Sequence, residues 1–316
     1  MYVRDSGMNG VIESFLVIGA VVAIGYLAGR TRLLGAAATE VLARAAFFIA
    51  SPALLFVTLM RAELSTVLSS ALVVTAVTSS VACLLYVPFG LLRRRPAAET
   101  TVGAMASGYV NAGNLGIPIA TYALGDASKI APVLLFQLAV LTPLFTTALD
   151  ILAERARGEK PRLLRSITVP LRNPIALATA AGLIASGTGY VPPEPVLAPI
   201  ELLADLAVPA MLLAFGISLH GAPRPGRSPA GMPALAAIVV IKNVVQPLMA
   251  VLMGVLFQLR GTELLAAVIC AALPTAQNVF GYAVRFEQGA TLAREAVLTT
   301  SLLSFPAMLA IVALVT

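Results

Sequence analysis

The stretches Asn111-Ala-Gly-Asn-Leu-Gly-Ile-Pro118 and Pro274-Thr-Ala-Gln-Asn278 place helix-breaking residues and amide side chains in the middle of long apolar segments. In hydrocarbon every unpaired backbone N–H or C=O group is costly, so a membrane helix can break only where it lines an enclosed or water-filled cavity. Paired interruptions in the two halves of a membrane chain are typical of a transporter's substrate site. These stretches therefore predict a polar site inside a membrane protein.

The composition is that of an integral membrane protein that lies in a lipid bilayer. Of the 316 residues, 59% are hydrophobic and 11% are charged, whereas about a quarter of the residues in a soluble domain are charged. The net charge of +6 is spread over short loops, which argues against a nucleic-acid partner. Apolar runs long enough to cross ~30 Å of hydrocarbon cover residues 11–29, 36–60, 66–92, 101–124, 129–153, 174–190, 196–220, 233–257, 263–285 and 291–315.

The basic residues indicate the orientation of these ten runs. Fifteen of the 21 Lys and Arg residues fall in the loops that follow runs 1, 3, 5, 7 and 9. Cytoplasmic loops carry such an excess. We therefore expect a multi-pass protein of the cytoplasmic (inner) membrane with both termini extracytoplasmic.

The runs divide into two sets of five. A polar cytoplasmic linker at 154–172 separates a first repeat at 1–153 from a second at 173–316, and because five is odd, the second repeat must be inverted. Pro52 and Pro209 stand at equivalent places in runs 2 and 7, where proline kinks a helix. We predict an all-α integral membrane protein of ten transmembrane helices in a five-plus-five inverted repeat, with discontinuous helices in runs 4 and 9 crossing at the midplane.

The residues around each break suggest what the site binds. Gly113 and Gly116 loosen run 4, Pro118 is placed to begin a second half-helix, and Pro274 breaks run 9. Two half-helix N-termini would aim N–H groups and positive dipole ends at one point, which favours an anion. Amide side chains can donate hydrogen bonds to a carboxylate, or they can serve only to bond the freed backbone groups of a kinked helix. The expected substrate-binding residues are Asn111, Asn114, Gln277 and Asn278.

Lys242 is the deepest basic residue, about ten residues into run 8, or ~15 Å at ~1.5 Å per residue. Charged groups inside a membrane span are usually functional or paired. Lys242 therefore either faces the substrate cavity or forms a buried ion pair with Asp205. Arg44 lies nearer the end of run 2, where a helix-bracing role is expected.

The remaining motifs exclude several classes of protein. The sequence contains no P-loop, HExxH or GxSxG pattern, so we expect neither direct use of ATP nor an enzyme, and no cofactor or metal. Cys83 and Cys270 fall inside apolar runs and read as small core residues. Gly25 and Gly29 have the spacing of a helix-packing motif, which would serve an intramolecular contact or a homodimer.

Taken together, the motif from Asn111 to Pro118, the Pro-Ala-Leu-Leu-Phe segment that begins at Pro52, the deep Lys242 and the break from Pro274 to Asn278 resemble the auxin efflux carrier family in its bacterial branch. The resemblance covers essentially the whole chain. It implies a fold shared with bile-acid-type sodium symporters, a scaffold and a transport domain, and small organic anions as substrates. Carried over by position, Asn111, Asn114, Gln277 and Asn278 would be the crossover-site residues.

The expected function is that of a secondary transporter. It would move a small organic anion, either an auxin-like monocarboxylate or a malate- or malonate-like dicarboxylate, across the cytoplasmic membrane by alternating access. The alternative is a sodium-coupled organic anion symporter of the bile-acid type, which would need oxygen ligands for a cation near the crossing. No acidic cluster lies at either break. A non-transporting sensor with the same fold is a further alternative.

Overall fold

The computed structural model describes residues 8–35, 37–62, 70–156, 158, 174–220, 231–286 and 288–315, and these residues are almost entirely helical. In the first half the helices are α1 Met8–Thr31, α2 Ala38–Ala45, η1 Ala46–Ala50, α3 Ser51–Arg61, α5 Ser70–Leu92, α6 Ala97–Gly108, η2 Ala112–Gly116, α7 Ile117–Ala123, η3 Ala127–Ile130, α8 Ala131–Phe136, η4 Gln137–Leu141 and α9 Thr142–Ala156. In the second half they are α11 Pro174–Thr188, α12 Glu194–Asp205, α13 Ala207–Leu219, α14 Gly231–Val240, η6 Ile241–Val245, α15 Gln246–Leu256, α16 Gly261–Ala272, α17 Gln277–Arg285 and α18 Ala290–Val315.

Helix occupies all ten runs, so the all-α class is confirmed. Five continuous helical segments are by themselves long and apolar enough to cross a membrane, namely Ala38–Arg61, Ser70–Leu92, Ala127–Arg155, Glu194–Leu219 and Gly231–Leu256. The chain is thus a multi-pass membrane protein, while ten crossings and their inversion stay predictions. Most of the expected linker at 154–172 lies outside the described residues.

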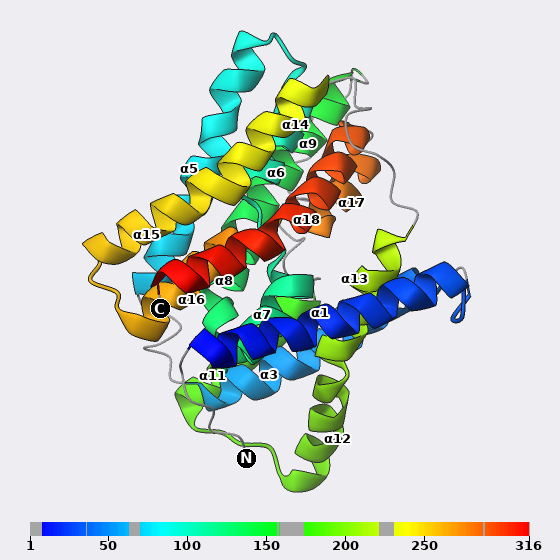
Figure 1. Ribbon diagram of the computed structural model, residues 1–316, viewed down its shortest axis with the longest axis vertical. Helices are drawn as coiled ribbons and strands as arrows, with labels where there is room; N and C mark the ends of the chain where they lie inside the picture. Colours follow the sequence, from blue (N-terminus) through cyan, green and yellow to red (C-terminus); the bar gives the residue numbers. More distant parts are fainter. Residues whose placement is uncertain are drawn as a thin grey trace.

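The helices pack as two sets (Figure 1). The first helix set comprises α1, α2–α3, α11, α12 and α13, in the lower part of the view, where α1 packs along α13 and α3 along α11. The second helix set comprises α5, α6, α9 and α14 to α18, in the upper part. Between them, α7 contacts α1 and α13, and α8 contacts both α5 and α11. The two sets are interleaved in sequence, because runs 1, 2, 6 and 7 build the first set.

Small residues let α1 and α13 approach closely. A Cβ atom on Gly25 would lie 2.6 Å from the carbonyl oxygen of Leu213, and one on Gly216 would lie 2.1 Å from that of Val22. Both neighbours are backbone atoms that cannot swing away. Gly29 likewise packs against Ile217 of α13. The glycine spacing in α1 therefore serves a contact within the chain.

Four prolines in the helical runs lie just after widened turns. A proline lacks an N–H group and its ring clashes with the carbonyl four residues earlier, so it strains a regular α-helix. A π-helical turn holds one more residue and gives that carbonyl room. Such pairs are Pro52 after η1, Pro118 after η2, Pro143 after η4 and Pro247 after η6. The expected kink at Pro52 is thus a π turn within a continuous helix, and Pro209 follows the irregular residue Leu206 between α12 and α13.

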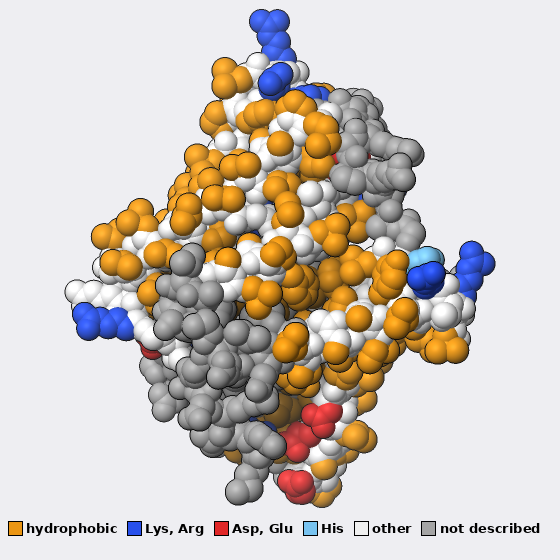
Figure 2. Space-filling model, viewed as in Figure 1, with side chains coloured by type: hydrophobic (Ala, Val, Ile, Leu, Met, Phe, Trp, Pro, Cys, Tyr) orange, Lys and Arg blue, Asp and Glu red, His pale blue; other side chains and the backbone are white. Residues whose placement is uncertain are grey.

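The surface fits a bilayer. Figure 2 shows hydrophobic side chains over most of the visible face, with Lys and Arg side chains at its extremities. Large apolar residues such as Leu84 on α5, Leu248 on α15 and Leu302 on α18 are exposed. In water such a surface would drive aggregation, whereas in a membrane it contacts lipid.

Candidate substrate site at the helix breaks

The breaks in runs 4 and 9 touch each other. Where α6 and α16 end, the two backbones run antiparallel and exchange hydrogen bonds. Asn111 N donates to Pro274 O at 2.7 Å, and Ala276 N donates to Tyr109 O at 3.1 Å. Each interrupted helix therefore satisfies part of the freed backbone of the other, as a buried break requires.

These two hydrogen bonds form an isolated antiparallel β-bridge between Val110 and Thr275, which we call the bridge. Side chains from neighbouring helices bond to the remaining backbone groups around it. Val110 N donates to Gln137 Oε1 at 2.7 Å, and Thr275 N donates to Thr300 Oγ1 at 3.0 Å. Thr275 Oγ1 in turn donates to Ala106 O at 2.6 Å. Neither Gln137 nor Thr300 is among the residues that the sequence predicted for the site. The signal for Gln137 was available, because it is the only amide in run 5.

The second half-helix of run 4 begins earlier than expected. Helical structure starts at Ala112, and Asn111 caps it by accepting a hydrogen bond from Asn114 N at 3.3 Å. Pro118 is the second residue of α7. The expectation that Pro118 starts the half-helix is therefore wrong, because the π turn η2 accommodates the proline ring and lets the helix continue through it.

The two glycines of η2 differ in their surroundings. A Cβ atom on Gly116 would lie within 3.0 Å of Ile130 and Leu273 side-chain atoms, so this glycine lets η2 pack against η3 and the end of α16. A Cβ atom on Gly113 would meet only Ile175, at 4.0 Å. Gly113 faces the cavity described below.

The expected amides do come together. Asn114 Nδ2 donates to Gln277 Oε1 at 3.0 Å, which links η2 to the start of α17 across the break. Asn111 and Asn278 line the same small cavity as Asn114. Of the two amides at the start of α17, Gln277 is thus the one that bonds to Asn114.

This cavity, which we call the amide cavity, lies between the two helix sets. Its volume is about 20 Å³, which is close to the space that one water molecule needs. Asn111 is 2% exposed, and its Nδ2 has no hydrogen-bond partner within the described part of the chain. The polar lining residues include Asn111, Asn114, Gln137 and Asn278, and the apolar ones include Phe47, Leu134, Leu138 and Ile175.

Lys242 does not line the amide cavity. It is fully buried on η6, where Nζ donates to Gln246 Oε1 and, at 3.5 Å, to Ala271 O. Asp205 is exposed on α12, so the alternative of a buried ion pair between Lys242 and Asp205 is wrong. Arg44 is exposed and pairs with Glu40 one turn away at 3.4 Å, in keeping with a bracing role.

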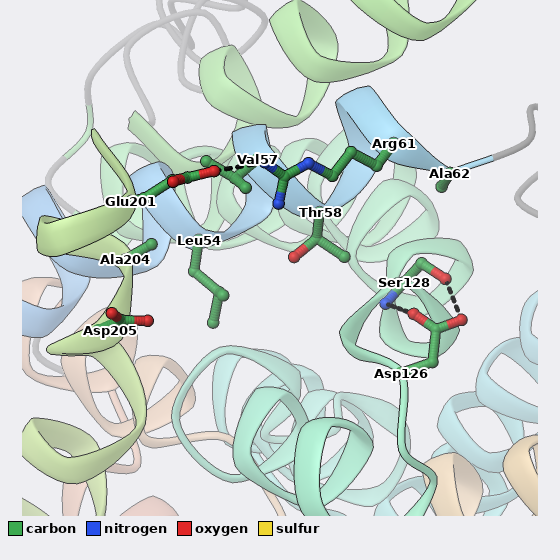
Figure 3. Close-up of a pocket in the computed structure, with 10 residues that line it drawn as sticks. All are labelled: Leu54, Val57, Thr58, Arg61, Ala62, Asp126, Ser128, Glu201, Ala204 and Asp205. Atoms are coloured by element: carbon green, nitrogen blue, oxygen red, sulfur yellow. Dashed lines mark hydrogen bonds and ion pairs between the residues drawn. The ribbon is translucent and has the colours of Figure 1, made fainter. Parts of the chain in front are cut away.

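A larger cavity of about 540 Å³ lies at the end of α3, between α12 and η3. Figure 3 shows Arg61 and Glu201 pointing toward each other as an ion pair, and Asp126 accepting hydrogen bonds from Ser128 N at 2.8 Å and Ser128 Oγ at 2.7 Å. This cavity shares no lining residue with the amide cavity. The guanidinium of Arg61 on its wall is already paired with Glu201, so this cavity is the weaker candidate for binding a carboxylate.

A family of known proteins and one curated relative match most of the chain. The model of a family described as membrane transport protein matches residues 10–312, which include both helix breaks. A curated protein of Rhizobium meliloti (strain 1021), named "Putative malonate transporter", is 31% identical over 266 residues, covering 81% of this chain and 81% of its own. These matches identify a transporter and not an enzyme. The chain belongs to this membrane transport protein family, the auxin efflux carrier family that its two helix-break motifs resemble.

Proposed function

We propose that this secondary transporter moves a small organic anion across the cytoplasmic membrane by alternating access and binds the anion's carboxylate in the amide cavity. Malonate- or malate-like dicarboxylates come first, in view of the relative's name, with auxin-like monocarboxylates next. The observation that carries the proposal is the buried Asn111 Nδ2, a donor without a partner within the described residues, on the wall of that cavity. An unsatisfied buried donor costs about 1–3 kcal/mol, and a bound carboxylate would supply the acceptor.

Backbone geometry adds to the attraction for an anion. The helical segment that starts at Ala112 and the helix α17 that starts at Gln277 both begin beside the Val110–Thr275 bridge. A helix N-terminus carries a partial positive charge and free N–H groups. Asn114 and Asn278 lie in the first turns of these two segments, so their amides stand where both N-termini favour negative charge.

The size of the amide cavity supports alternating access. At about 20 Å³ it cannot hold a dicarboxylate. Phe47 and Ile175 come from the first helix set, and they close the cavity over the amides. We infer that the two helix sets part to admit substrate and close again around it.

Two pairs of positions support the proposed inverted repeat of 1–153 and 173–316. Val110 and Thr275 pair at the bridge and stand 165 residues apart. Gly125, two residues after α7, and Gly289, four residues after α17, have φ values of +71° and +59° and stand 164 residues apart. The first separation is one residue longer than the second. The π turn η2 lies between Val110 and Gly125, and its one extra residue accounts for this difference. Ten spans with both termini extracytoplasmic are part of this proposal.

The test uses an isosteric change. Asn111→Asp keeps the Oδ1 that accepts from Asn114 N, while it removes the Nδ2 donor and adds a negative charge. The purified protein is screened for thermal stabilisation by malonate, malate and indole-3-acetate, and then for uptake of the best ligand into proteoliposomes. A lost hydrogen bond to a charged group costs about 1.5–3 kcal/mol, so affinity should fall by about tenfold to more than a hundredfold.

The control is Thr188→Val, an exposed hydroxyl at the far end of α11, which should bind as the wild type does. Wild-type affinity in Asn111→Asp would remove the amide cavity as the substrate site. If no acid in the panel stabilises the protein and none is taken up, the proposed substrate class is wrong.

A further inference from the structure

A second polar cluster lies beside the bridge, on helices that the amide cavity does not involve. Lys242 Nζ donates to Gln246 Oε1 and to Ala271 O, and Gln246 Nε2 donates to Ser79 Oγ at 3.3 Å. Lys242 is 0% exposed and Gln246 and Ser79 are 1% exposed. We call Ser79, Lys242, Gln246 and the carbonyl of Ala271 the Lys242 cluster.

The contact with Ala271 places the amino group of Lys242 at the C-terminal end of α16. Helix α16 ends at Ala272, and the next residue, Leu273, turns to ψ 143°, so the last carbonyls of the helix lack intrahelical partners. A helix C-terminus carries a partial negative charge that a basic side chain can offset. In transporters with broken helices, carbonyls at such half-helix ends typically hold the coupling cation.

We propose that the Lys242 amino group occupies the place of a coupling cation at the C-terminus of α16. The chain then carries its own basic group where a sodium-coupled carrier would bind Na⁺, and wild-type transport requires no sodium. Removal of this side chain leaves Gln246 Oε1 and Ala271 O beside a vacated space, with Ser79 Oγ bonded to the same Gln246 amide, and these oxygens form a site for a small monovalent cation. The statement that transport requires no sodium rests on the proposed function, whereas the place of the amino group does not.

Further contacts tie this cluster to the helix break. Asn243, the next residue of η6, donates through Nδ2 to Thr300 O at 3.2 Å. Thr300 Oγ1 accepts from Thr275 N at the bridge. The segment η6 thus holds the end of α16 through Lys242 and reaches the bridge through Thr300. Lys242 is therefore a positioning residue that acts on the anion site through the helix break.

The experiment measures thermal unfolding in detergent without any substrate, in sodium chloride and in choline chloride of equal ionic strength. Wild type should unfold at the same temperature in both salts. Lys242→Ala should unfold at a lower temperature in choline and regain part of the loss as sodium rises, because a cation that binds only the folded state stabilises it by mass action. The matched control is Ile238→Ala on α14, also 0% exposed, which should lose stability equally in both salts.

Sodium-specific stabilisation of the wild type would overturn the proposal without any variant. An equal response of Lys242→Ala to sodium and choline would also overturn it. If Lys242→Ala does not fold, Lys242→Ser adds a hydroxyl oxygen to the same three and should show a larger sodium response, and its absence counts against the proposal in the same way. Because no organic anion is present, failure here leaves the amide cavity untouched, and failure of the substrate screen leaves the Lys242 result standing.

Discussion

At the residue scale, the amide side chains around the helix breaks differ in which groups they bond. Asn111 caps a helix through its oxygen, and we propose that its nitrogen binds the substrate, whereas Gln137 accepts a hydrogen bond from the backbone N–H of Val110. Both are 2% exposed. Composition and spacing cannot separate these roles, because an amide in an apolar run only signals that some polar group nearby needs a partner.

The hydrogen bond between Asn114 and Gln277 predicts an energetic coupling. Asn114→Ala and Gln277→Ala should each lower the unfolding midpoint, and the double variant should lose less than the sum. A side-chain hydrogen bond contributes about 0.5–1.5 kcal/mol, and the coupling free energy in a double-mutant cycle should fall in that range. Asn114→Ala combined with the distant Thr188→Val serves as the additive control. Additive losses for the first pair would contradict the Asn114–Gln277 bond.

At the element scale, backbone irregularities and small residues decide how the helices run and pack. The π turns before Pro52, Pro118, Pro143 and Pro247 keep the helices continuous, while the true breaks lie only where a partner backbone supplies hydrogen bonds. The sequence located both breaks. It misplaced the start of the second half-helix, because the pattern of glycine and proline does not distinguish a π turn from a break.

The close contact of α1 with α13 makes a paired prediction within one helix. Gly25→Ala places a Cβ atom against the carbonyl of Leu213, and overpacking of this kind costs about 1–3 kcal/mol. Gly19→Ala meets nothing within 4 Å and should change stability by less than about 1 kcal/mol, in the stabilising direction. Thermal unfolding of the two variants in detergent compares them directly. Equal midpoints would mean that α1 and α13 lie farther apart than described.

At the scale of the whole molecule, the proposed function depends on how the two helix sets enclose the amide cavity. Residues of both sets line this cavity, and the larger cavity lies at the end of α3 that the charge pattern predicts to be extracytoplasmic. The basic residues at the extremities in Figure 2 frame an apolar surface that a bilayer covers. In the proposed mechanism of alternating access, motion of one set against the other is the step that exposes the amides to either side.

The orientation can be tested by cysteine labelling in a Cys83→Ala, Cys270→Ala background. By the charge pattern, Gly158 is cytoplasmic, and the exposed Val191 between α11 and α12 is extracytoplasmic. An impermeant maleimide added to intact cells should label Val191→Cys at once and Gly158→Cys only after permeabilisation. The cysteine-free chain is the control. Labelling of both sites from one side would remove the ten-span inverted arrangement.

The sequence by itself determined the membrane class, the helical runs, the places of both breaks and the identity of most amides around them. These follow from local chemistry, since hydrophobic length, helix breakers and amides in apolar runs act within a few residues of chain. Only the tertiary structure decided that Asn114 bonds to Gln277, that Gln137 and Thr300 support the bridge, and that Lys242 faces Ala271 instead of Asp205 or the amide cavity. Those outcomes depend on which faces of helices far apart in sequence are packed together, and a one-residue shift such as a π turn rotates every later side chain to a new neighbour.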